Sequence, residues 1–585
     1  MFDPESLSGA MRYAHAETDI EQLVVFLKLG PDRNSFPSYE IVTEFNLFTR
    51  MRDGVRLSTD VYRPRERRKW PTILIRTPYD NNVTNFVDFG KRFAAWGYAV
   101  AIQDVRGRYD SEGEWYPSKN EGKDGNDTLK WLSHQKWCNG KVGMTGGSYN
   151  AMVQWDVAVL KPPNLKAMVS MVCPSDLFVN CWYREGTLGW GDTLRWLVHV
   201  DARVNQNLLA YNMRELYWHV PFKNVDEALG RHVAFWRDWI KHQTYDSYWK
   251  ATSYHNRYHL VGVPVLHISG WYDDCADGNI HNYLSMKKNG RTALARNNQR
   301  LVMGPWAHHI NESRKYGDMD FGATSLVDLD GLQKRWFDYW LKGIQNGVTA
   351  EPGVSIFVMG RNEWREEDDW PISRAKLTKF YFHSKGHANS LLGDGRLSTK
   401  TPGEEPADAF DYDPDNPCPS PINVNEPDDR RPAERRDDVL VYDSERLSKP
   451  VEVTGNIFVE LFAVSSAQDT DFVAHLVDVY PNGYAHPVAD GIMTARYHNS
   501  IEKPENILPG KAYRYRINLW HTCNLFTKSH KVRVEISSAD FPRYARNMNT
   551  GKPYGADLKG KLAHQEILHN SKHASNIELP IAKSY

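Results

Sequence analysis

One stretch of the chain, Lys141–Trp155, constrains the fold more than any other. It reads as a short apolar strand, two glycines, a serine and then a helix. Gly146 and Gly147 allow a sharp turn, because they have no side chains that would collide there. Such a turn lifts the hydroxyl of Ser148 clear of its backbone and puts it at a helix N-terminus, where N–H groups can stabilise an oxyanion. The layout predicts a nucleophile elbow, with Asn150 where the usual pattern has a second glycine. A Gly-Ser loop without chemistry is the alternative.

Strands separated by helices surround this stretch. Short apolar strands are predicted over 71–75, 98–104, 141–144, 166–171, 263–268 and 299–303, and helices over about 86–96, 124–133 and 325–343. A hairpin with an Asp-Gly turn over 41–63 precedes them. This alternation is typical of a parallel sheet with helices on both faces, in which ligands bind beyond the carboxyl ends of the strands. Ser148 falls at one of these ends.

Two other parts of the chain have a different character. Residues 174–255 are rich in tryptophan with helix-like periodicity, which predicts an inserted helical cap. After residue 351 short alternating runs separated by turns predict a jelly-roll β-sandwich, and they lie over 354–359, 378–382, 451–464, 472–480, 513–519 and 532–537. Within that part, residues 401–438 are rich in Pro and Asp, and we expect a surface excursion without regular structure.

The composition excludes several classes of function. At 585 residues, with 41% hydrophobic and 25% charged residues, the chain has the profile of a soluble protein of several domains. A net charge of −1 favours neither nucleic acid nor an anionic membrane, and no apolar run is long enough to span a bilayer. The N-terminus has no visible signal peptide, so we expect a cytoplasmic location. The six cysteines lack metal-ligand spacing, so no metal or other cofactor is expected. The sequence leaves open whether the chain forms a homo-oligomer.

A nucleophilic serine needs a base, and the base needs an orienting carboxylate. In an α/β-hydrolase these follow the serine in the order Asp, then His, on loops at strand ends. Asp273 follows the strand that ends at Ile268, and His308 follows the strand that ends at Met303. A helix-cap or turn role is the alternative for Asp273, and a surface-loop role for His308. The adjacent acid and histidine, at positions 274 and 309, are competitors, and we expect only one of each pair to face Ser148.

At these residues the sequence resembles the cocaine esterase-like serine hydrolases, which are related to X-Pro dipeptidyl-peptidases and α-amino acid ester hydrolases. The resemblance is collinear from about residue 40 to the C-terminus. It rests on six short blocks, which are Arg76-Thr-Pro-Tyr79-Asp80, Gln103 to Gly113, Ser148-Tyr149, Gly270-Trp-Tyr-Asp273, Gly304-Pro-Trp-Ala-His308, and Asp469 to Gly483. It implies an α/β-hydrolase domain over 1–173 and 256–350, a helical cap over 174–255 and a C-terminal jelly roll over 351–585.

The resemblance also implies roles for individual residues. Ser148 would be the acylated nucleophile, His308 the general base and acid, and Asp273 its orienting carboxylate. The Tyr79 hydroxyl and the backbone N–H of Tyr149 would form the oxyanion hole. A phenol suits this role because it is neutral at pH 7 and stiff, although Tyr79 has the alternative of a packing role. The family's glycine three residues after the nucleophile is alanine here, a methyl group that we expect the triad to tolerate.

The positions around the triad aspartate bear on the substrate. The α-amino acid ester hydrolases carry two extra carboxylates there that hold a substrate ammonium, and this chain has Cys275 and Ala276 instead. Asp277, one residue further on, is expected to cap the helix that begins there, with a role as a weak substitute for those carboxylates as the alternative. An ester whose acyl or alcohol part fits a Trp-rich pocket is therefore favoured. The candidates for lining that pocket, each with a core role as the alternative, are Trp182, Trp190 and Trp271.

The sequence thus predicts a serine hydrolase that cleaves small-molecule carboxylic esters through an acyl-enzyme. One alternative is an amidase, acylase or dipeptidyl-peptidase-like enzyme that cleaves peptide or β-lactam side-chain amides with the same groups. Another is a catalytically inactive protein whose jelly roll binds carbohydrate, although an intact triad with Tyr79 argues against it.

Overall fold

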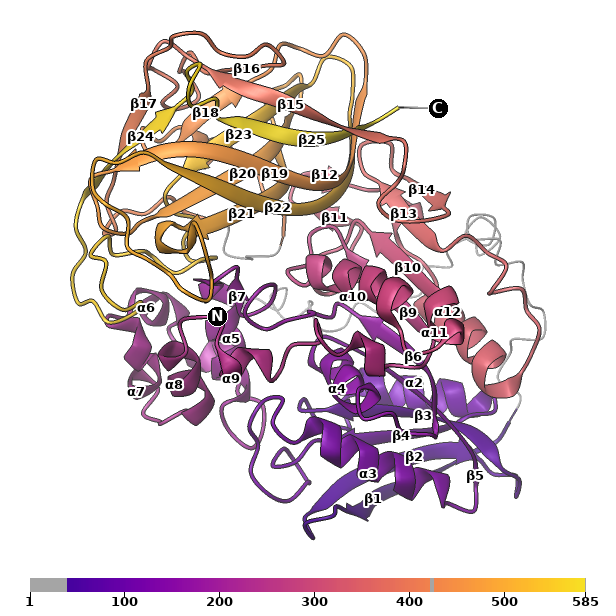
Figure 1. Cartoon of the computed structure of the whole chain (residues 1–585). Coiled ribbons are helices and arrows are strands. Elements are labelled where there is room, and N and C mark those ends of the chain that lie inside the picture. Colours follow the sequence, from indigo (N-terminus) through magenta and orange to yellow (C-terminus); the bar gives the residue numbers. More distant parts are fainter. Residues whose placement is uncertain (1–38, 421–425, 584–585) are drawn as a thin grey trace, which may run out of the picture.

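The computed structural model describes residues 39–420 and 426–583 of the chain. It consists of an α/β domain, a helical cap and an all-β domain (Figure 1). The expectation about the N-terminus lies outside the described residues, as do residues 421–425 of the predicted excursion. Within the described residues, no helix is both long and apolar enough to cross a membrane.

A ten-stranded sheet forms the centre of the α/β domain. Its strands, in spatial order, are β1 (Ile41–Arg50), β2 (Arg56–Pro64), β4 (Ala99–Asp104), β3 (Trp70–Thr77), β5 (Cys138–Gly147), β6 (Leu165–Met171), β9 (Val265–Gly270), β10 (Gln299–Gly304), β13 (Val354–Val358) and β14 (Glu363–Glu367). The strands from β4 to β13 run parallel, whereas the hairpin β1–β2 and strand β14 are antiparallel at the two edges. The predicted hairpin and parallel strands are therefore confirmed.

Helices cover both faces of this sheet, because alternate residues of its buried strands point to opposite sides. Leu74 of β3 packs into the core beneath α3, α4 and the cap, while Ile73 and Ile75 pack into the core beneath α2 and α12. The helices of this domain are α2 (Thr84–Ala95), α3 (Glu121–Ser133), α4 (Tyr149–Ala158), α10 (Ala276–Asn289), α11 (Ala293–Asn297), α12 (Leu329–Phe337) and the π-helical turn η6 (Asp338–Lys342). The helix expected over 325–343 begins later, because the Asp328 side chain accepts a hydrogen bond from Gly331 N and caps it at residue 329.

The cap is inserted between β6 and β9 and is mostly helical, as predicted. Its elements are β7 (Tyr183–Arg184), β8 (Thr187–Leu188), α5 (Trp190–Val200), η2 (Leu208–Ala210), α6 (Met213–Trp218), η3 (Phe222–Asn224), α7 (Val225–Ala228), α8 (Ala234–Lys241), α9 (Ser247–Lys250) and η4 (Tyr258–Leu260). Tryptophans fill its interior, where Trp236, Trp239 and Trp249 are buried. A small excursion after β10 adds β11 (Lys315–Tyr316), β12 (Met319–Asp320) and η5 (Ala323–Ser325).

The C-terminal domain is the predicted jelly roll, at the top of Figure 1. Its strands are β15 (Ala375–His383), β16 (Arg396–Ser398), β17 (Asp408–Tyr412), β18 (Leu440–Asp443), β19 (Val451–Ser465), β20 (Asp471–Val479), β21 (Ala485–Thr494), β22 (Tyr513–Phe526), β23 (Lys531–Ser537), β24 (Ala563–Leu568) and β25 (Asn576–Ala582), with short helices α13 (Arg431–Glu434) and η7 (Ala495–Tyr497). In the second half of β19 buried and half-buried residues alternate, as expected for a strand with one face in the core.

Two expectations for this part of the chain were wrong. The run 354–359 was assigned to the jelly roll, but β13 pairs in parallel with β10 and extends the α/β sheet, so the boundary at residue 351 falls too early for it. An alternating run predicts a strand but not the sheet that it joins. The excursion 401–438 was expected to lack regular structure, yet β17 lies within it and pairs with β24, and α13 follows near its end.

Candidate active site

The predicted elbow lies between β5 and α4. Ser148 has φ 57° and ψ −125°, a left-handed conformation that side chains rarely adopt, and its N–H donates to the Met171 carbonyl oxygen of β6 at 3.0 Å. Gly146 has φ 140°, and a Cβ there would lie 2.6 Å from Cβ of Asn150. The turn therefore requires glycine at 146. The alanine at position 151 is fully buried within α4, so the helix accommodates the methyl group that replaces the family's glycine.

The acid and the base lie on loops after neighbouring strands. Strands β9 and β10 pair in parallel up to Gly270 and Gly304, so Asp273 and His308 emerge at the same edge of the sheet as Ser148. The loops are tied by backbone bonds from 271 N to 304 O (2.9 Å) and from 272 N to 306 O (3.0 Å). A Cβ at Gly270 would lie 2.0 Å from the Trp306 carbonyl oxygen, so glycine permits this close approach.

The three predicted triad residues form a continuous hydrogen-bonded line. His308 Nε2 lies 3.0 Å from Ser148 Oγ, and His308 Nδ1 lies 2.8 Å from Asp273 Oδ1. Asp273 is buried, and its carboxylate also accepts hydrogen bonds from the Ser269 hydroxyl and, at 3.1 Å, from the Cys275 N–H. These two bonds fix the carboxylate in its orientation toward the imidazole. His309 is exposed, and its ring centroid lies 6.1 Å from that of His308.

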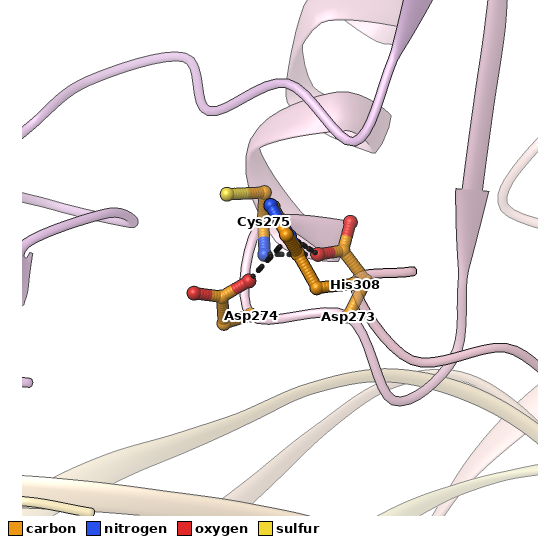
Figure 2. A group of neighbouring side chains, drawn as sticks. All are labelled: Asp273, Asp274, Cys275 and His308. Carbon is orange, nitrogen blue, oxygen red and sulfur yellow. Dashed lines mark hydrogen bonds and ion pairs between the residues drawn. The ribbon is translucent and has the colours of Figure 1, made fainter. Parts of the chain in front are cut away.

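Asp274 was expected to face away from the histidine, and this was wrong. Its Oδ1 lies 2.9 Å from His308 Nδ1, on the other side of the imidazole from Asp273 (Figure 2). This oxygen makes no aligned hydrogen bond within the described residues, whereas Asp273 Oδ1 does. Asp273 therefore orients the ring, and Asp274 contributes negative charge. The turn at 273–275 curls around Nδ1 and brings both carboxylates close.

The charges around His308 control its protonation. Burial acts to lower the pKa of His308, but Asp274 and Asp273 outweigh it and raise that pKa well above its usual range. Burial raises the pKa of Asp273, against the opposing effect of His308. For Asp274 burial also acts upward, but His308 holds its pKa below the usual range. The two carboxylates together stabilise the imidazolium form of His308.

Tyr79 lies on the loop after β3. Its hydroxyl accepts a hydrogen bond from Nε1 of Trp196 at 2.9 Å, and its N–H donates to Oγ1 of Thr77 at 3.0 Å. Burial raises the pKa of Tyr79, while hydrogen bonding to Trp196 and Ser148 acts in the opposite direction. The phenol is therefore protonated at neutral pH and remains a hydrogen-bond donor.

Tyr149 is the first residue of α4, where backbone N–H groups have no partner within the helix. Its own side chain points into the core. The Tyr149 hydroxyl donates to Oε1 of Glu121 at 2.9 Å and accepts from the Ser118 N–H at 3.0 Å. Glu121 is in turn paired with Arg76 at 2.9 Å, and both are buried. This network anchors the start of α4.

The predicted pocket tryptophans occupy three different surroundings. Trp190 is buried in the cap, and its Nε1 donates to the Tyr217 carbonyl oxygen at 3.0 Å. Trp182 is half-buried, with its ring 4.5 Å from that of Trp196. Trp271 is buried and, of the three, is the one that lines a cavity between residues of the α/β domain, the cap and the jelly roll.

Comparisons with known proteins agree with this arrangement. Residues 53–310 match the family model of the X-Pro dipeptidyl-peptidases (S15 family), and residues 346–578 match that of the X-Pro dipeptidyl-peptidase C-terminal non-catalytic domain. A cocaine esterase from Rhodococcus sp. (strain MB1 Bresler) is 36% identical over 575 residues, which cover 92% of this chain and 98% of the relative. The chain belongs to the cocaine esterase-like serine hydrolases.

Solved structures extend this relationship. An α-amino acid ester hydrolase superposes with a TM-score of 0.80 at 25% identity, covering 93% of this chain and 97% of its own. An aminopeptidase from a marine sediment archaeon (Thaumarchaeota archaeon) has the same fold, with a TM-score of 0.82 at 24% identity and the same coverage. The chain is thus an enzyme of the cocaine esterase-like family and a serine hydrolase.

The positions that bind a substrate ammonium in the α-amino acid ester hydrolases, according to the sequence resemblance, hold no carboxylate in this cocaine esterase-like chain. Cys275 and Ala276 are both buried. Asp277 was expected to cap the following helix, but α10 already begins at 276, so this carboxylate lies within its first turn. There it accepts a long hydrogen bond of 3.4 Å from Nδ2 of Asn180.

The carboxylates, thiol and imidazole in Figure 2 are also metal-ligand types. The candidate ligand atoms of Asp273, Asp274, Cys275 and His308 all lie within 4.8 Å of one another. Both ring nitrogens of His308 are already engaged, Nε2 with Ser148 and Nδ1 with Asp273. A metal ion bound here would have to displace the hydrogen bond that orients the imidazole, so metal binding and this triad geometry exclude each other.

Sequence reasoning missed two contacts at this site. The contact of Asp274 with His308 depends on the curl of a turn, which the residue types do not reveal. Trp196 lies in the tryptophan-rich stretch 174–255 but was not singled out, although it is the tryptophan bonded to Tyr79. Its place on an amphipathic helix beside an aromatic cluster was the available signal, but many core tryptophans share that pattern.

Proposed function

We propose that this enzyme hydrolyses carboxylic esters through an acyl-enzyme formed on Ser148. The observation that carries the proposal is the line from Ser148 Oγ to His308 Nε2 (3.0 Å) and from Nδ1 to Asp273 (2.8 Å). It joins a half-buried elbow serine to a base whose ring is held by a buried carboxylate. This is the relation that makes a serine hydroxyl nucleophilic.

In the first half-reaction, Ser148 Oγ attacks the ester carbonyl carbon while its proton passes to His308 Nε2. The carbonyl π electrons move to oxygen and form a tetrahedral oxyanion. Asp273 holds the proton on Nδ1, so Nε2 is the free base whenever His308 is neutral, and the imidazolium is stabilised as it forms. The C–O bond to the alcohol then breaks, and His308 returns its proton to the departing alkoxide.

The oxyanion is held, in this proposal, by the Tyr79 hydroxyl and the Tyr149 backbone N–H. The Tyr79 hydroxyl suits this role because the phenol stays protonated. The Tyr149 N–H suits it because it lies at the start of α4 beside the nucleophile. Preorganised donors of this kind are worth about 3–4 kcal/mol each in the transition state. The start of α4 is held by the buried Tyr149–Glu121 bond, which limits movement of that N–H.

The second half-reaction repeats these steps with water. His308 removes a proton from water, the hydroxide oxygen attacks the acyl carbon, and the same donors hold the second oxyanion. Collapse breaks the bond to Ser148 Oγ, which regains its proton from His308, and the carboxylic acid departs. The two half-reactions, as proposed, use protein groups and water alone.

An ester without an α-ammonium group is the favoured substrate. The cocaine esterase of Rhodococcus covers nearly the whole chain, and positions 275 and 276 carry no charge that would hold an ammonium. The aromatic cluster around Trp196, which contacts Tyr79 and includes Trp182, supports an aromatic or otherwise apolar acyl or alcohol part. Trp190 and Trp271, which we also predicted, donate their indole N–H groups to the backbone carbonyl oxygens of Tyr217 and Phe357, which favours packing roles.

A second candidate is the cleavage of amides, in the manner of an X-Pro dipeptidyl-peptidase or an acylase. The match of both domains to X-Pro dipeptidyl-peptidase models supports it. An amine leaves less readily than an alkoxide unless it is protonated, so this reaction depends more heavily on proton donation by His308.

Matched ester and amide substrates with the same acyl group separate the two. We expect kcat/KM to be at least about a hundredfold higher for the ester and a fluorophosphonate probe to label Ser148. A higher kcat/KM for the amide, or for an X-Pro peptide, would favour the second candidate. Failure of the probe to label the protein would instead support a catalytically inactive binding protein.

A further inference from the structure

The hydroxyl of Tyr79 has a neighbour in the cap that the proposed mechanism does not use. Trp196 lies on α5, and its Nε1 donates to the Tyr79 oxygen at 2.9 Å. Its indole ring also stacks on Tyr149, with a centroid distance of 6.1 Å and an interplanar angle of 24°. One cap residue thus contacts both residues that supply the proposed oxyanion donors.

The direction of this hydrogen bond matters for catalysis. An indole N–H can only donate, so the Tyr79 oxygen must be the acceptor. The bond occupies a lone pair of the phenol and leaves its own O–H free to point elsewhere. A hydroxyl that accepts a hydrogen bond becomes a stronger donor, because the chain of hydrogen bonds polarises along its length.

The hydrogen bond from Trp196 also makes the Tyr79 phenol more acidic, which agrees with its effect on donor strength. Burial raises the pKa of Tyr79, and the hydrogen bond from Trp196 is the largest of the effects that oppose this rise. A bond that lowers the pKa of a phenol stabilises negative charge on its oxygen. The Tyr79 hydroxyl is therefore a stronger hydrogen-bond donor to an acceptor that becomes negative, as the substrate carbonyl oxygen does.

We propose that Trp196 is a positioning residue of the oxyanion hole, which orients and polarises the Tyr79 hydroxyl through its indole N–H. The inference rests on the proposed function, because it acts through Tyr79 on the oxyanion. It makes the cap a part of the transition-state machinery as well as a cover for the site.

The surrounding aromatic cluster supplies a contrast. Trp182 packs against Trp196 at 4.5 Å, yet its buried Nε1 has no hydrogen-bond partner among the described residues. Trp239 is buried and stacks on Trp196 with a centroid distance of 6.0 Å and an angle of 14°. All three rings pack in the cluster, but it is Trp196 that donates a hydrogen bond to Tyr79.

The test uses Trp196→Phe, which removes the N–H and keeps an aromatic ring in the stack. We expect kcat for a p-nitrophenyl ester to fall about 5- to 20-fold, less than the loss expected when the Tyr79 hydroxyl itself is removed. KM should change less than about threefold, because the bond matters most once charge has developed. Trp239→Phe is the control, since it takes similar volume from the same stack without touching Tyr79, and we expect its kcat to stay within about twofold.

A double-mutant cycle distinguishes positioning from packing. In a Tyr79→Phe background, Trp196→Phe should change kcat less than about twofold, because there is no phenol left to polarise. An equal loss in both backgrounds, or a rise in KM without a fall in kcat, would overturn the proposal. Thermal unfolding of each variant checks that the comparison is made on folded protein.

The rate of Ser148 labelling by a fluorophosphonate separates this inference from the proposed function. Labelling of the wild-type protein supports the serine hydrolase mechanism, and slower labelling of Trp196→Phe than of Trp239→Phe supports the positioning role. Equal rates for these two variants overturn the role of Trp196 alone. If the wild-type protein is not labelled, the proposed function fails and this inference falls with it.

Discussion

Two clusters of serine, histidine and aspartate in this chain have different arrangements. In the α/β domain, His308 bridges its partners, with Nε2 toward Ser148 and Nδ1 toward Asp273. In the jelly roll, Ser384 and Asp408 both contact the same nitrogen, Nε2 of His569, at 3.1 and 2.8 Å.

The second arrangement cannot activate its serine. The Ser384 hydroxyl donates directly to Asp408 Oδ1 at 2.7 Å, so its proton points at the carboxylate and not at the imidazole. Asp408 and His569 are fully buried, and the Tyr442 hydroxyl occupies Asp408 Oδ2 at 2.8 Å. The comparison shows that the three residue types do not make a triad. What matters is that acid and nucleophile lie on opposite nitrogens of the ring, at a site that substrate can reach.

Removal of each serine tests this comparison most strongly. Ser148→Ala should lower kcat for ester hydrolysis by about 10⁶ without lowering the unfolding midpoint, because an elbow serine serves chemistry and not packing. Ser384→Ala should leave kcat/KM unchanged and destabilise the jelly roll by about 1–3 kcal/mol, since Asp408 loses a buried donor. Steady-state kinetics and thermal unfolding measure both. More than about a hundredth of wild-type kcat in Ser148→Ala would contradict the assignment of the nucleophile.

The carboxylates of the site should differ almost as sharply. Asp273→Asn should lower kcat by about 10⁴, because an amide at this position favours the wrong histidine tautomer. Asp274→Asn should cost less than about tenfold at the optimum pH, since Asp274 makes no aligned hydrogen bond to the ring. Parallel kinetics of the two variants provide the check. A larger loss in Asp274→Asn would transfer the role of orienting acid to Asp274.

Tyr79→Phe keeps the ring and removes the hydroxyl alone. We expect kcat to fall by about 10²–10³ with a smaller change in KM, because the bond strengthens as negative charge develops. Kinetics on a single ester are sufficient. A large rise in KM at constant kcat would mean that the hydroxyl binds ground-state substrate. No change in either constant would make Tyr79 a packing residue.

The pH profile should reveal the second carboxylate. Activity needs neutral His308, so kcat/KM should rise with pH through the pKa of His308, which the adjacent acids hold well above its usual range. Asp274→Asn removes a negative charge that favours the imidazolium, so this limb should move to lower pH. Profiles of the wild type and the variant, fitted over the same pH range, test the shift. A limb that stays in place would show that Asp274 does not act on His308.

Much of the fold and of the candidate site could be predicted from the sequence, because local patterns encode them. The strand-turn-helix at Ser148 and the loops that carry Asp273 and His308 each come directly after an apolar strand. In a parallel sheet such strand ends necessarily share one edge. The order of these residues and the family resemblance then selected them without any knowledge of distance.

What the sequence did not reveal depends on contacts between distant segments. The run 354–359 was recognised as a strand but given to the wrong sheet, because its pairing with β10 leaves no mark in its own residues. The bond from Trp196 to Tyr79 joins positions far apart in the chain. The approach of Asp274 to His308 depends on the geometry of one turn. Each of these is fixed by tertiary packing and not by local propensity.

The last prediction concerns the jelly-roll cluster, where we expect a substitution to change stability and to leave catalysis unchanged. Burial acts to lower the pKa of His569, but Asp408 outweighs burial and raises that pKa. Burial acts to raise the pKa of Asp408, but His569 and the hydrogen bonds that Asp408 accepts lower that pKa. The stabilisation due to His569 is therefore complete below its unfolded pKa of about 6.5 and is lost as pH rises through the folded value. That due to Asp408 is present above about 3.8 and is lost as pH falls.

His569→Gln should consequently lower the unfolding midpoint more at pH 6 than at pH 9, with a loss of about 3–5 kcal/mol at the lower pH for a buried pair deprived of one partner. Its kcat/KM for the ester should equal that of the wild type at temperatures where both are folded, because His569 lies in the core of another domain. Calorimetric scans at the two pH values and kinetics at one temperature provide the measurements. An equal loss of stability at both pH values would mean that His569 acts through packing and neutral hydrogen bonds. A loss of activity in the folded variant would mean that the jelly-roll cluster is coupled to the catalytic one, and the contrast between the two clusters would then no longer hold.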